Sequence, residues 1–512
     1  MTELPSARIL IFVVAYNAES TLASVLDRVP KELHQSNVEV LIIDDSSTDD
    51  TFGAGLRSAA VRQGFKIHIL RNPVNQGYGG NQKLGYHYAI ENGFDIVVLL
   101  HGDGQYAPEK MPMLLEPLIR KEADAVFGSR MIHRKDALQG GMPFYKWVGN
   151  QVLTRFQNRI LGTQLSEFHS GYRLYRTDAL RKIPFERNSN DFHFDTDIIV
   201  QLHFAGLKIS ELPIPTFYGD EICRVNGLKY AWDVCRSVVR ARLHSINLLY
   251  DRKFDVGQPE FNYSLKLGFC SSHTMALGAV RPGATVLDVG CGQGDVAALM
   301  ADTAAKVVGV DQYPGTSEKA NITLLPWKGD SEDIPVSCGE FDQIFLLDII
   351  EHLRDPDAFM EKLRDATGSK RPEIILTTAN VAFLVTRLML LVGNFNYGRK
   401  GILDRTHTRL FTFRSLCELL EQAGYEVVAL RGIPAPWPAA FGPGWFGRML
   451  VRLNQAAIWL SKGLFSYQMF VKARTRPSLR HVFEETVQAS EVLKRQAIAP
   501  QFFSPVGADQ SS

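Results

Sequence analysis

Residues 38–47 read VEVLIIDDSS, an apolar run that ends in two aspartates and two serines. Such a run, rich in β-branched residues, predicts a buried strand with polar groups at its end. Further runs of this kind occur between residues 9 and 214, and amphipathic stretches such as 21–33 separate several of them. The other predicted strands are Ile9–Val14, Lys66–Leu70, Ile96–Leu100, Ala123–Phe127 and Lys208–Ile214. The alternation predicts an α/β domain with a mostly parallel sheet.

Parallel sheets bind ligands beyond the carboxyl ends of their strands. We therefore expect a site at Asp44–Ser47 and at His101–Gln105, where two of the predicted strands end.

A second series of strand and helix patterns begins near residue 283. Its predicted strands are Thr285–Val289, Lys306–Val310, Phe341–Leu347, Glu373–Leu376 and Tyr425–Ala429. Residues 251–268 mix charge, glycine, proline and aromatics without a clear period, so we place a linker there. The predicted organisation is one α/β domain at 1–250, a second at 269–474, and a tail at 475–512 that is partly helical and then disordered.

Composition narrows the function classes. The chain has 512 residues, 56 Lys and Arg against 55 Asp and Glu, and six widely spaced cysteines. This length disfavours a single domain, and the near-zero charge disfavours nucleic acid as a partner. The cysteine spacing predicts free thiols in a reducing compartment. Because no uncharged stretch reaches the roughly 18 residues of a spanning helix, we expect a cytoplasmic protein, soluble or peripheral at the inner face of the membrane.

Carboxylates follow the strands of the amino-terminal half. A transferase that uses a nucleotide-diphospho-sugar must hold a diphosphate beside a divalent metal. Asp45 and Asp103 follow two strands, and oxygen ligands such as those of Asp103 and Gln105 suit Mg²⁺ or Mn²⁺ next to phosphates. An isolated aspartate is more often a turn residue or helix cap, but here several occur in order.

Five short motifs accompany these carboxylates: VAYNAE at 14–19, DDSSTD at 44–49, NQGYGG at 75–80, GDGQ at 102–105 and GSR at 128–130. Together they resemble family-2 glycosyltransferases of the dolichol-phosphate mannosyltransferase type, over residues 8 to about 245. The resemblance implies the GT-A nucleotide-diphospho-sugar fold, inversion at the sugar, a nucleotide-sugar donor and a polyprenyl-phosphate or glycan acceptor. It implies nucleoside contacts by Tyr16 and Asp45, metal and diphosphate contacts by Asp103 and Gln105, and a donor-side contact by Arg130.

One position departs from that pattern. The family's metal motif usually reads D-x-D-x-Q, whereas this chain has His101 in the first acidic position. Neutral imidazole can ligate a divalent metal, but it is softer than a carboxylate and adds no negative charge. This predicts weaker magnesium affinity or a manganese preference if His101 is a ligand. The alternative, that His101 touches no metal, stays open.

Residues 191–197 (DFHFDTD) resemble the acidic stretch that supplies a catalytic carboxylate near the acceptor. Asp195 and Asp197 are both candidates, and we favour Asp197. The two project to the same side if the segment is extended but diverge if it opens a helix, where a first-turn carboxylate can be purely structural. An alcohol acceptor needs a base, whereas a lipid phosphate is already anionic, so the requirement depends on the acceptor.

Two segments suggest surface contacts. Residues 228–250 place apolar side chains on one helical stripe, with Lys229, Arg236 and Arg240 elsewhere on the surface. This helix either lies on an anionic lipid surface or docks on its own domain, which is the commoner arrangement. Residues 434–459 are rich in proline and aromatics and predict a lid or acceptor wall, or ordinary packing with a surface anchor.

In the carboxy-terminal half, residues 286–294 read VLDVGCGQG, a strand that enters a glycine-rich turn. Such a turn lets the backbone approach a ligand, but alone it equally suits a nicotinamide dinucleotide. The other signals are Asp311 at the end of the next strand, Asp330 after a third, EHL at 351–353 and GILDRTH at 401–407.

This ordered set resembles class I S-adenosylmethionine-dependent methyltransferases, over about residues 265–473, and implies that cofactor. The implied cofactor-binding residues are Asp288, Gly290, Gly292 and Gly294 at the methionine and ribose, Asp311 at the ribose and Asp330 at the adenine. His352 and His407 are candidate bases, with a structural hydrogen-bonding role as the alternative, because methyl transfer needs mainly in-line alignment. Asp348, Glu351 and His352 also resemble a metal set of quinone-precursor methyltransferases.

The sequence thus predicts a bifunctional enzyme that transfers a sugar and a methyl group in one glycan or glycolipid pathway. The main alternative is a methyltransferase whose amino-terminal domain only binds a nucleotide sugar or lipid. A nicotinamide-dependent oxidoreductase is a third interpretation, which the motif set disfavours.

Overall fold

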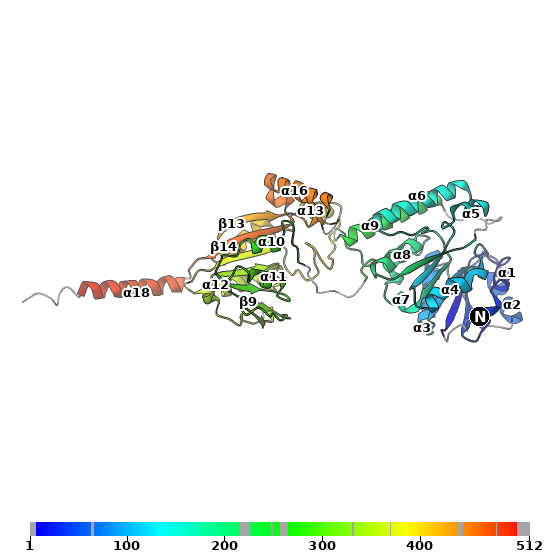
Figure 1. Ribbon diagram of the computed structural model, residues 1–512, viewed down its shortest axis with the longest axis horizontal. Coiled ribbons are helices and arrows are strands. Elements are labelled where there is room, and N and C mark those ends of the chain that lie inside the picture. The colour runs from blue at the N-terminus through cyan, green and yellow to red at the C-terminus, as the bar shows by residue number, and fades with distance from the viewer. Residues whose placement is uncertain are drawn as a thin grey trace, which may run out of the picture. The chain divides into compact units, whose positions relative to one another are not determined.

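Two seven-stranded sheets organise the chain, one in each of two units at residues 1–260 and 261–512 (Figure 1). The computed structural model describes residues 7–62, 66–215, 226–246, 249–256, 265–329, 332–368, 370–438, 442, 444–477 and 479–498. The predicted fold class, two α/β domains, is confirmed.

The sheet of the first unit has the order β3-β2-β1-β4-β6-β5-β7. Its strands are β1 (Ile9–Ala15), β2 (Val38–Asp44), β3 (Lys66–Arg71), β4 (Ile96–His101), β5 (Ala125–Ser129), β6 (Arg173–Arg176) and β7 (Ile209–Pro213). Alternate residues of β1 enter two different core clusters, so helices cover both faces. The chain builds the sheet outward from β1 through β2 and β3 and then returns to β4. This reversal makes the ends of β1 and β4 the switch point where a ligand is expected.

One strand of this sheet was not predicted. β6 runs antiparallel between β4 and β5. Its sequence, RLYR, has no apolar run that would predict a strand. Arg173, which opens the strand, is nevertheless buried, because its guanidinium donates to three backbone carbonyls.

The helices of the first unit are α1 (Leu22–Asp27), α2 (Thr51–Val61), α3 (Tyr78–Glu91), α4 (Met111–Ile119), α5 (Arg134–Gln139), α6 (Phe144–Leu161), α7 (Thr177–Leu180), α8 (Phe194–Phe204) and α9 (Gly227–Ser245). Short 3₁₀ turns lie at η1 (Lys31–Leu33), η2 (Pro108–Lys110) and η3 (Phe185–Arg187). The single helix expected over 21–33 is instead α1 followed by η1, because Pro30 cannot donate a helical hydrogen bond and disfavours helix in the residue before it.

The amphipathic helix α9 docks on its own unit. Val234, Val238 and Ala241 enter the same core cluster as Phe254, which belongs to the segment after the helix. Leu228 and Trp232, at the other side of the helix, remain exposed.

The second sheet has the order β10-β9-β8-β11-β12-β14-β13. Its strands are β8 (Thr285–Val289), β9 (Lys306–Asp311), β10 (Ile322–Pro326), β11 (Gln343–Leu347), β12 (Glu373–Ala379), β13 (Tyr425–Ile433) and β14 (Gln468–Thr475). The sequence did not predict β14, which runs antiparallel between β12 and β13. The order again reverses at its first strand, which places the switch point at the ends of β8 and β11.

The helices of this unit are α10 (Ser272–Leu277), α11 (Asp295–Met300), α12 (Pro356–Thr367), α13 (Leu384–Leu391), α14 (Phe413–Gln422), α16 (Trp445–Leu460), α17 (Lys462–Phe465) and α18 (Leu479–Ile498), with 3₁₀ turns η5 (Cys338–Glu340) and η6 (Ile350–His352). None of the described helices is both long and apolar enough to cross a bilayer. Five cysteines are free thiols, and Cys223 lies outside the described residues.

Candidate active sites

The first candidate site lies where β1 and β4 end. The backbone N–H of Gly102 donates to the carbonyl of Val14 at 2.9 Å, which holds the GDGQ motif against β1. The side chain of Asp103 is 46% exposed, and its Oδ1 accepts the N–H of Gln105 at 3.0 Å. Tyr16, directly after β1, is also exposed. The switch point therefore presents an aromatic ring and an accessible carboxylate to solvent.

His101, at the end of β4, lies beside this carboxylate with 14% of its side chain exposed. Its Nδ1 lies 4.0 Å from Oδ2 of Asp103, and its Nε2 lies 3.4 Å from the hydroxyl of Tyr78. A Cβ on Gly171 would come within 2.6 Å of the imidazole, so that position leaves room only for glycine. Burial lowers the pKa of His101, although Asp103 and Asp195 oppose the shift. The imidazole is therefore neutral near pH 7, which is the form that ligates metals.

Asp45, at the end of β2, holds the loop that leads into α3. Its buried carboxylate accepts the amide of Asn72 at 2.7 Å and the backbone N–H groups of Gln76 at 2.8 Å and Gly77 at 3.0 Å. The structure thus places Asp45 as a support of the NQGYGG segment.

Arg130, after β5, is bound by a carboxylate that the sequence did not single out. Glu167 accepts the Arg130 guanidinium at 2.5 Å and its backbone N–H at 2.8 Å. Burial alone would raise the pKa of Glu167, but the charge and hydrogen bonds of Arg130 bring it below its ordinary value. The pair is therefore ionised, and Glu167 fixes the direction of Arg130. A lone glutamate between a serine and a phenylalanine gave no signal for this role.

The helix α8 begins at Phe194, so Asp195 and Asp197 lie in its first turn and diverge. Asp195 accepts the hydroxyl of Tyr78 at 2.9 Å and lies 3.7 Å from the guanidinium of the buried Arg173. Through Tyr78 it connects to His101 and so to Asp103.

Asp197 points elsewhere. Its fully buried carboxylate accepts the hydroxyl of Ser237, the ammonium of Lys253 at 2.8 Å and the backbone N–H of Ser189 at 3.1 Å. These partners enclose Asp197 and tie α8 to α9 and to the segment that follows. These contacts give Asp197, the favoured candidate, a structural role, whereas Asp195 is the aspartate whose carboxylate accepts the Tyr78 hydroxyl.

The second candidate site lies where β8 and β9 end. Gly290, Gly292 and Gly294 all have positive φ, at 79°, 57° and 89°. A Cβ on Gly290 or Gly294 would clash with a side chain, at 2.9 and 2.7 Å, whereas one on Gly292 would meet nothing within 4 Å. The turn therefore exposes its backbone at Gly292. Asp311 supports it, because its two oxygens accept the N–H groups of Gly292 at 2.9 Å and Tyr313 at 3.0 Å.

Asp288, one residue before the end of β8, is only 2% exposed. No donor among the described residues reaches its Oδ1. Burial, with a contribution from the nearby Asp311, raises the pKa of Asp288 to about 7. An orphaned buried acceptor beside an open glycine turn fits the ammonium and hydroxyl donors of S-adenosylmethionine. Asp330, the implied adenine contact, lies outside the described residues.

This pKa predicts a pH dependence of cofactor binding. The affinity for S-adenosylmethionine should rise as the pH increases from 6 to 8, because the ionised Asp288 is the better acceptor. Asp288→Asn should remove this rise and weaken binding at pH 8 about 10- to 100-fold, the range for a lost charged hydrogen bond. Isothermal titration calorimetry of the full chain measures both.

The same raised pKa lowers the stability of the cofactor-free protein, since the folded state keeps a proton that the unfolded state releases above pH 4. The free energy of unfolding therefore falls as the pH rises from the ordinary aspartate pKa to the raised pKa of Asp288, about 7. Asp288→Asn should melt higher than the wild type at pH 8, and a parallel pH slope of the two melting temperatures would contradict the assignment.

The two histidine candidates lie together. The rings of His352, in η6, and His407 are 4.8 Å apart and nearly perpendicular. The Nδ1 of His352 lies 3.2 Å from the carbonyl of Thr406, and that of His407 lies 2.9 Å from the carbonyl of Ile402. Each Nδ1 therefore donates, which leaves Nε2 as the basic nitrogen. Burial lowers the pKa of His407.

Glu351 lies next to this pair but makes no metal site with it. Burial and the charge of Asp348 raise the pKa of Glu351 to about 8. Of the residues the structure describes, only Asp191, His193 and Asp233 form a group of three ligand atoms within 4.8 Å of one another. The resemblance of Asp348, Glu351 and His352 to a metal set is thus not matched by their geometry. Asp191 is moreover paired with Lys229 at 2.8 Å.

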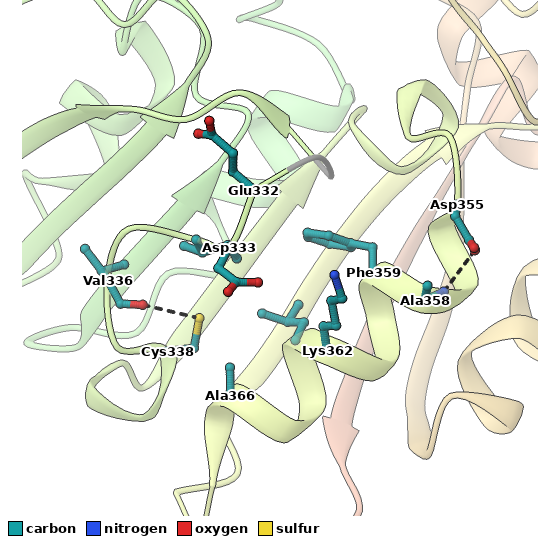
Figure 2. Close-up of a pocket in the computed structure, with 11 residues that line it drawn as sticks. Glu332, Asp333, Val336, Cys338, Asp355, Ala358, Phe359, Lys362 and Ala366 are labelled. Carbon is teal, nitrogen blue, oxygen red and sulfur yellow. Dashed lines mark hydrogen bonds between the residues drawn. The ribbon is translucent and has the colours of Figure 1, made fainter.

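A cavity of about 270 Å³ lies between α12 and the segment before η5 (Figure 2). Phe359, Leu363 and Val336 give it apolar walls, and Glu332, Asp333 and Lys362 add charges. Asp355 nearby is occupied as the cap of α12, where it accepts the N–H of Ala358 at 3.0 Å. Of the implied cofactor residues that the structure describes, none lines this cavity.

Two family models match the chain. One, described as glycosyl transferase family 2, matches residues 10–184, and the other, described as a methyltransferase domain, matches residues 265–430.

Several curated proteins are similar to parts of the chain. An undecaprenyl-phosphate mannosyltransferase of Micrococcus luteus is 30% identical over 218 residues, which cover 42% of this chain and 85% of that protein. A polyprenol monophosphomannose synthase of Mycolicibacterium smegmatis is 27% identical over 214 residues, with 42% and 78% covered. A ubiquinone biosynthesis O-methyltransferase of Dinoroseobacter shibae is 29% identical over 161 residues, with 30% and 63% covered.

Among solved structures, glucosyl-3-phosphoglycerate synthase from Mycobacterium tuberculosis, in complex with Mn²⁺, uridine diphosphate and glucosyl-3-phosphoglycerate, is 18% identical. The match covers 46% of this chain and 79% of that chain, with a TM-score of 0.34.

Proposed function

Because the chain belongs to glycosyl transferase family 2 and carries a methyltransferase domain after it, we propose that it is a bifunctional enzyme of lipid-linked glycan chemistry. The first unit transfers a sugar from a nucleotide-diphospho-sugar to a polyprenyl phosphate. The second transfers a methyl group from S-adenosylmethionine in the same glycan or glycolipid pathway. The acceptor class follows the names of the two mannosyl-transferring relatives.

The observation that carries the glycosyltransferase proposal is the line of Asp103, His101, Tyr78 and Asp195 at the switch point of the first sheet. Asp103, Gln105 and His101 would hold a divalent cation. When bound, such a cation neutralises the diphosphate that leaves with the nucleotide. The half-exposed carboxylate and the neutral imidazole 4.0 Å away are chemically suited to it.

Asp195 is the carboxylate that we assign to this site in place of Asp197. A polyprenyl phosphate is already anionic at neutral pH and needs no base. Asp195 then acts as a positioning residue, because it fixes the Tyr78 hydroxyl that faces Nε2 of His101. The exposed Tyr16 lies at the same edge of the sheet and would contact the nucleoside. Arg130, whose direction Glu167 fixes, supplies positive charge at this edge.

In the second unit, the exposed turn at Gly292 and the carboxylates of Asp288 and Asp311 would hold S-adenosylmethionine. The cofactor supplies the methyl group. His352 and His407 each keep a proton on Nδ1, so Nε2 of either can accept the proton that an acceptor hydroxyl loses.

The proposal is tested with the purified full chain. Radiolabelled UDP- and GDP-sugars are offered with undecaprenyl phosphate and Mn²⁺ or Mg²⁺, and S-adenosylmethionine labelled in its methyl group is added before or after the sugar. We expect metal-dependent sugar label in the lipid fraction and methyl label that depends on the sugar step.

Three results would contradict parts of it. Absence of both sugar transfer and S-adenosylmethionine binding contradicts the whole proposal. Donor binding without turnover favours the alternative in which the first unit is only a binding module. Methylation that is indifferent to prior sugar transfer removes the shared pathway.

A further inference from the structure

Two helices of the methyltransferase unit, α13 and α16, leave large apolar side chains in water. On α16, Trp445 is 72% exposed and Trp459 is 87% exposed, and on α13 Leu391 is 81% exposed. The other exposed apolar residues of the two helices and of the turn after α13 are Leu388, Leu390, Val392, Phe395, Phe446, Met449, Leu453 and Leu460. We call these eleven side chains the apolar face. Exposed apolar surface on this scale marks an interaction site.

The helices that carry the apolar face are firmly held from the other side. The inner face of α16 buries Gly447, Val451 and Ile458. Its Asn454 accepts the N–H of Ala435 at 2.9 Å and the indole N–H of Trp437 at 3.1 Å. The outward side chains are therefore not the result of an undocked helix.

Both helices also rest on one cluster. Phe383 and Val385, at the start of α13, pack with Ala435 and Trp437, which precede α16. The amide of Asn380, after β12, donates to carbonyls of the α17 region at 3.0 and 2.8 Å. Figure 1 shows α13 and α16 together on one side of their unit.

The charge of these segments is one-sided. Residues 374–403 and 427–483 contain no aspartate or glutamate, although the chain as a whole is balanced. Arg387, Arg448 and Arg452 are exposed, and none of them forms an ion pair within the described part of the chain. An apolar face with a basic border and no acidic residues complements an anionic lipid surface. Tryptophans at both ends of α16 suit the headgroup level of a bilayer.

The sheet topology relates the apolar face to the cofactor site. α13 follows the carboxyl end of β12, and α16 follows that of β13. β12 is parallel to β11 and β11 to β8, while β13 and β12 are both antiparallel to β14. The carboxyl ends of β8, β12 and β13 therefore lie at the same edge of the sheet.

We propose that α13 and α16 lie on an anionic lipid bilayer and hold the methyltransferase unit there with the carboxyl edge of its sheet toward the lipid. The helices lie on the surface, as no described helix can span it. A methyl acceptor embedded in that bilayer would then reach the edge where Asp288 and Gly292 lie. This inference does not depend on either transfer activity, because binding is measured without donor or acceptor.

Cosedimentation of the full chain with vesicles tests the proposal. We expect binding to vesicles of phosphatidylglycerol and phosphatidylcholine but little to phosphatidylcholine alone. The double substitution Leu453→Glu with Leu460→Glu should lower the affinity at least tenfold, because it places charges on the apolar face. Arg448→Gln with Arg452→Gln should lower it about 25-fold, at about fivefold for each arginine near an anionic surface.

Two controls make the result specific. Val428→Glu, at a residue of β13 that is 50% exposed and outside the apolar face, should bind like the wild type. Trp232→Glu tests α9 of the first unit. Unchanged S-adenosylmethionine binding shows that the variants of the second unit are folded, and an unchanged circular dichroism spectrum and melting temperature show the same for Trp232→Glu.

The proposal is wrong if the apolar-face variants sediment like the wild type, if phosphatidylcholine binds equally well, or if only Trp232→Glu abolishes binding. It is also wrong if the protein ignores vesicles and forms a dimer that Leu453→Glu with Leu460→Glu dissociates, since the occupant would then be a second copy of the chain.

Discussion

Asp103→Asn should lower the rate of sugar transfer by about 1,000-fold or more and leave methyl transfer at the wild-type level. Asparagine keeps the shape of the side chain and the oxygen that accepts the Gln105 N–H, but it removes the charge that attracts a divalent cation. A cation that neutralises the leaving diphosphate lowers the barrier by several kcal/mol, and a loss of about 4 kcal/mol corresponds to this factor. Both activities are measured on the same preparation of the full chain.

The matched control is Asp311→Asn in the other unit. It should abolish S-adenosylmethionine binding and spare sugar transfer, because Asp311 shapes only the glycine turn. If either substitution removes both activities from a folded protein, the two sites are not independent. If Asp103→Asn transfers sugar at the wild-type rate at limiting Mn²⁺, Asp103 is not a metal ligand.

Asp195→Asn should lower kcat for sugar transfer about 100-fold with little change in KM for the donor. The substitution weakens the acceptor of the Tyr78 hydroxyl and so releases the group that faces His101. Positioning defects of this kind reach such factors when reacting groups move by about 1 Å. Tyr78→Phe should show a similar loss, and the double variant should be little worse than either single one, because the two residues act through one contact.

Asp197→Asn distinguishes this role from a structural one. Asp197 lies two residues from Asp195 in the same helical turn. Its substitution leaves the Lys253 ammonium without its buried carboxylate partner. We expect a loss of about 3 kcal/mol in the free energy of unfolding and a kcat within a few-fold of the wild type for the protein that remains folded. A larger kcat defect for Asp197→Asn than for Asp195→Asn would restore Asp197 as the catalytic candidate.

The strands and the turn that the sequence predicted correctly are all marked by a pattern of neighbouring residues. The strands β2, β4 and β9 are apolar runs that end in a polar residue. β1 is followed directly by Tyr16 and Asn17, and β8 runs into the glycine turn, so each strand and its end are visible in the pattern. The glycine turn at 290–294 is visible because its positive φ values require glycine. Such signals are local, so they can be read from the sequence without knowing which distant residues the strand or turn contacts.

Residues whose role depends on distant partners were not predictable. Glu167 and Arg173 are buried charges whose partners, Arg130 and Asp195, lie after β5 and in α8, and neither lies in a recognisable motif. β6 is short of pattern signals because its four residues are RLYR, and β14 (QMFVKART) offers only the three-residue apolar run 469–471. Each pairs antiparallel with strands from earlier in the chain.

The sequence by itself determined the class of both domains, the order of their strand-end motifs and the identity of the polar groups at each switch point. Only the tertiary structure shows that Asp195 accepts the Tyr78 hydroxyl while Asp197 accepts the Ser237 hydroxyl, because α8 begins at Phe194 and turns the two side chains apart. It alone also showed that the apolar residues of α13 and α16 point outward, since a hydrophobic stripe predicts a buried surface without stating what covers it.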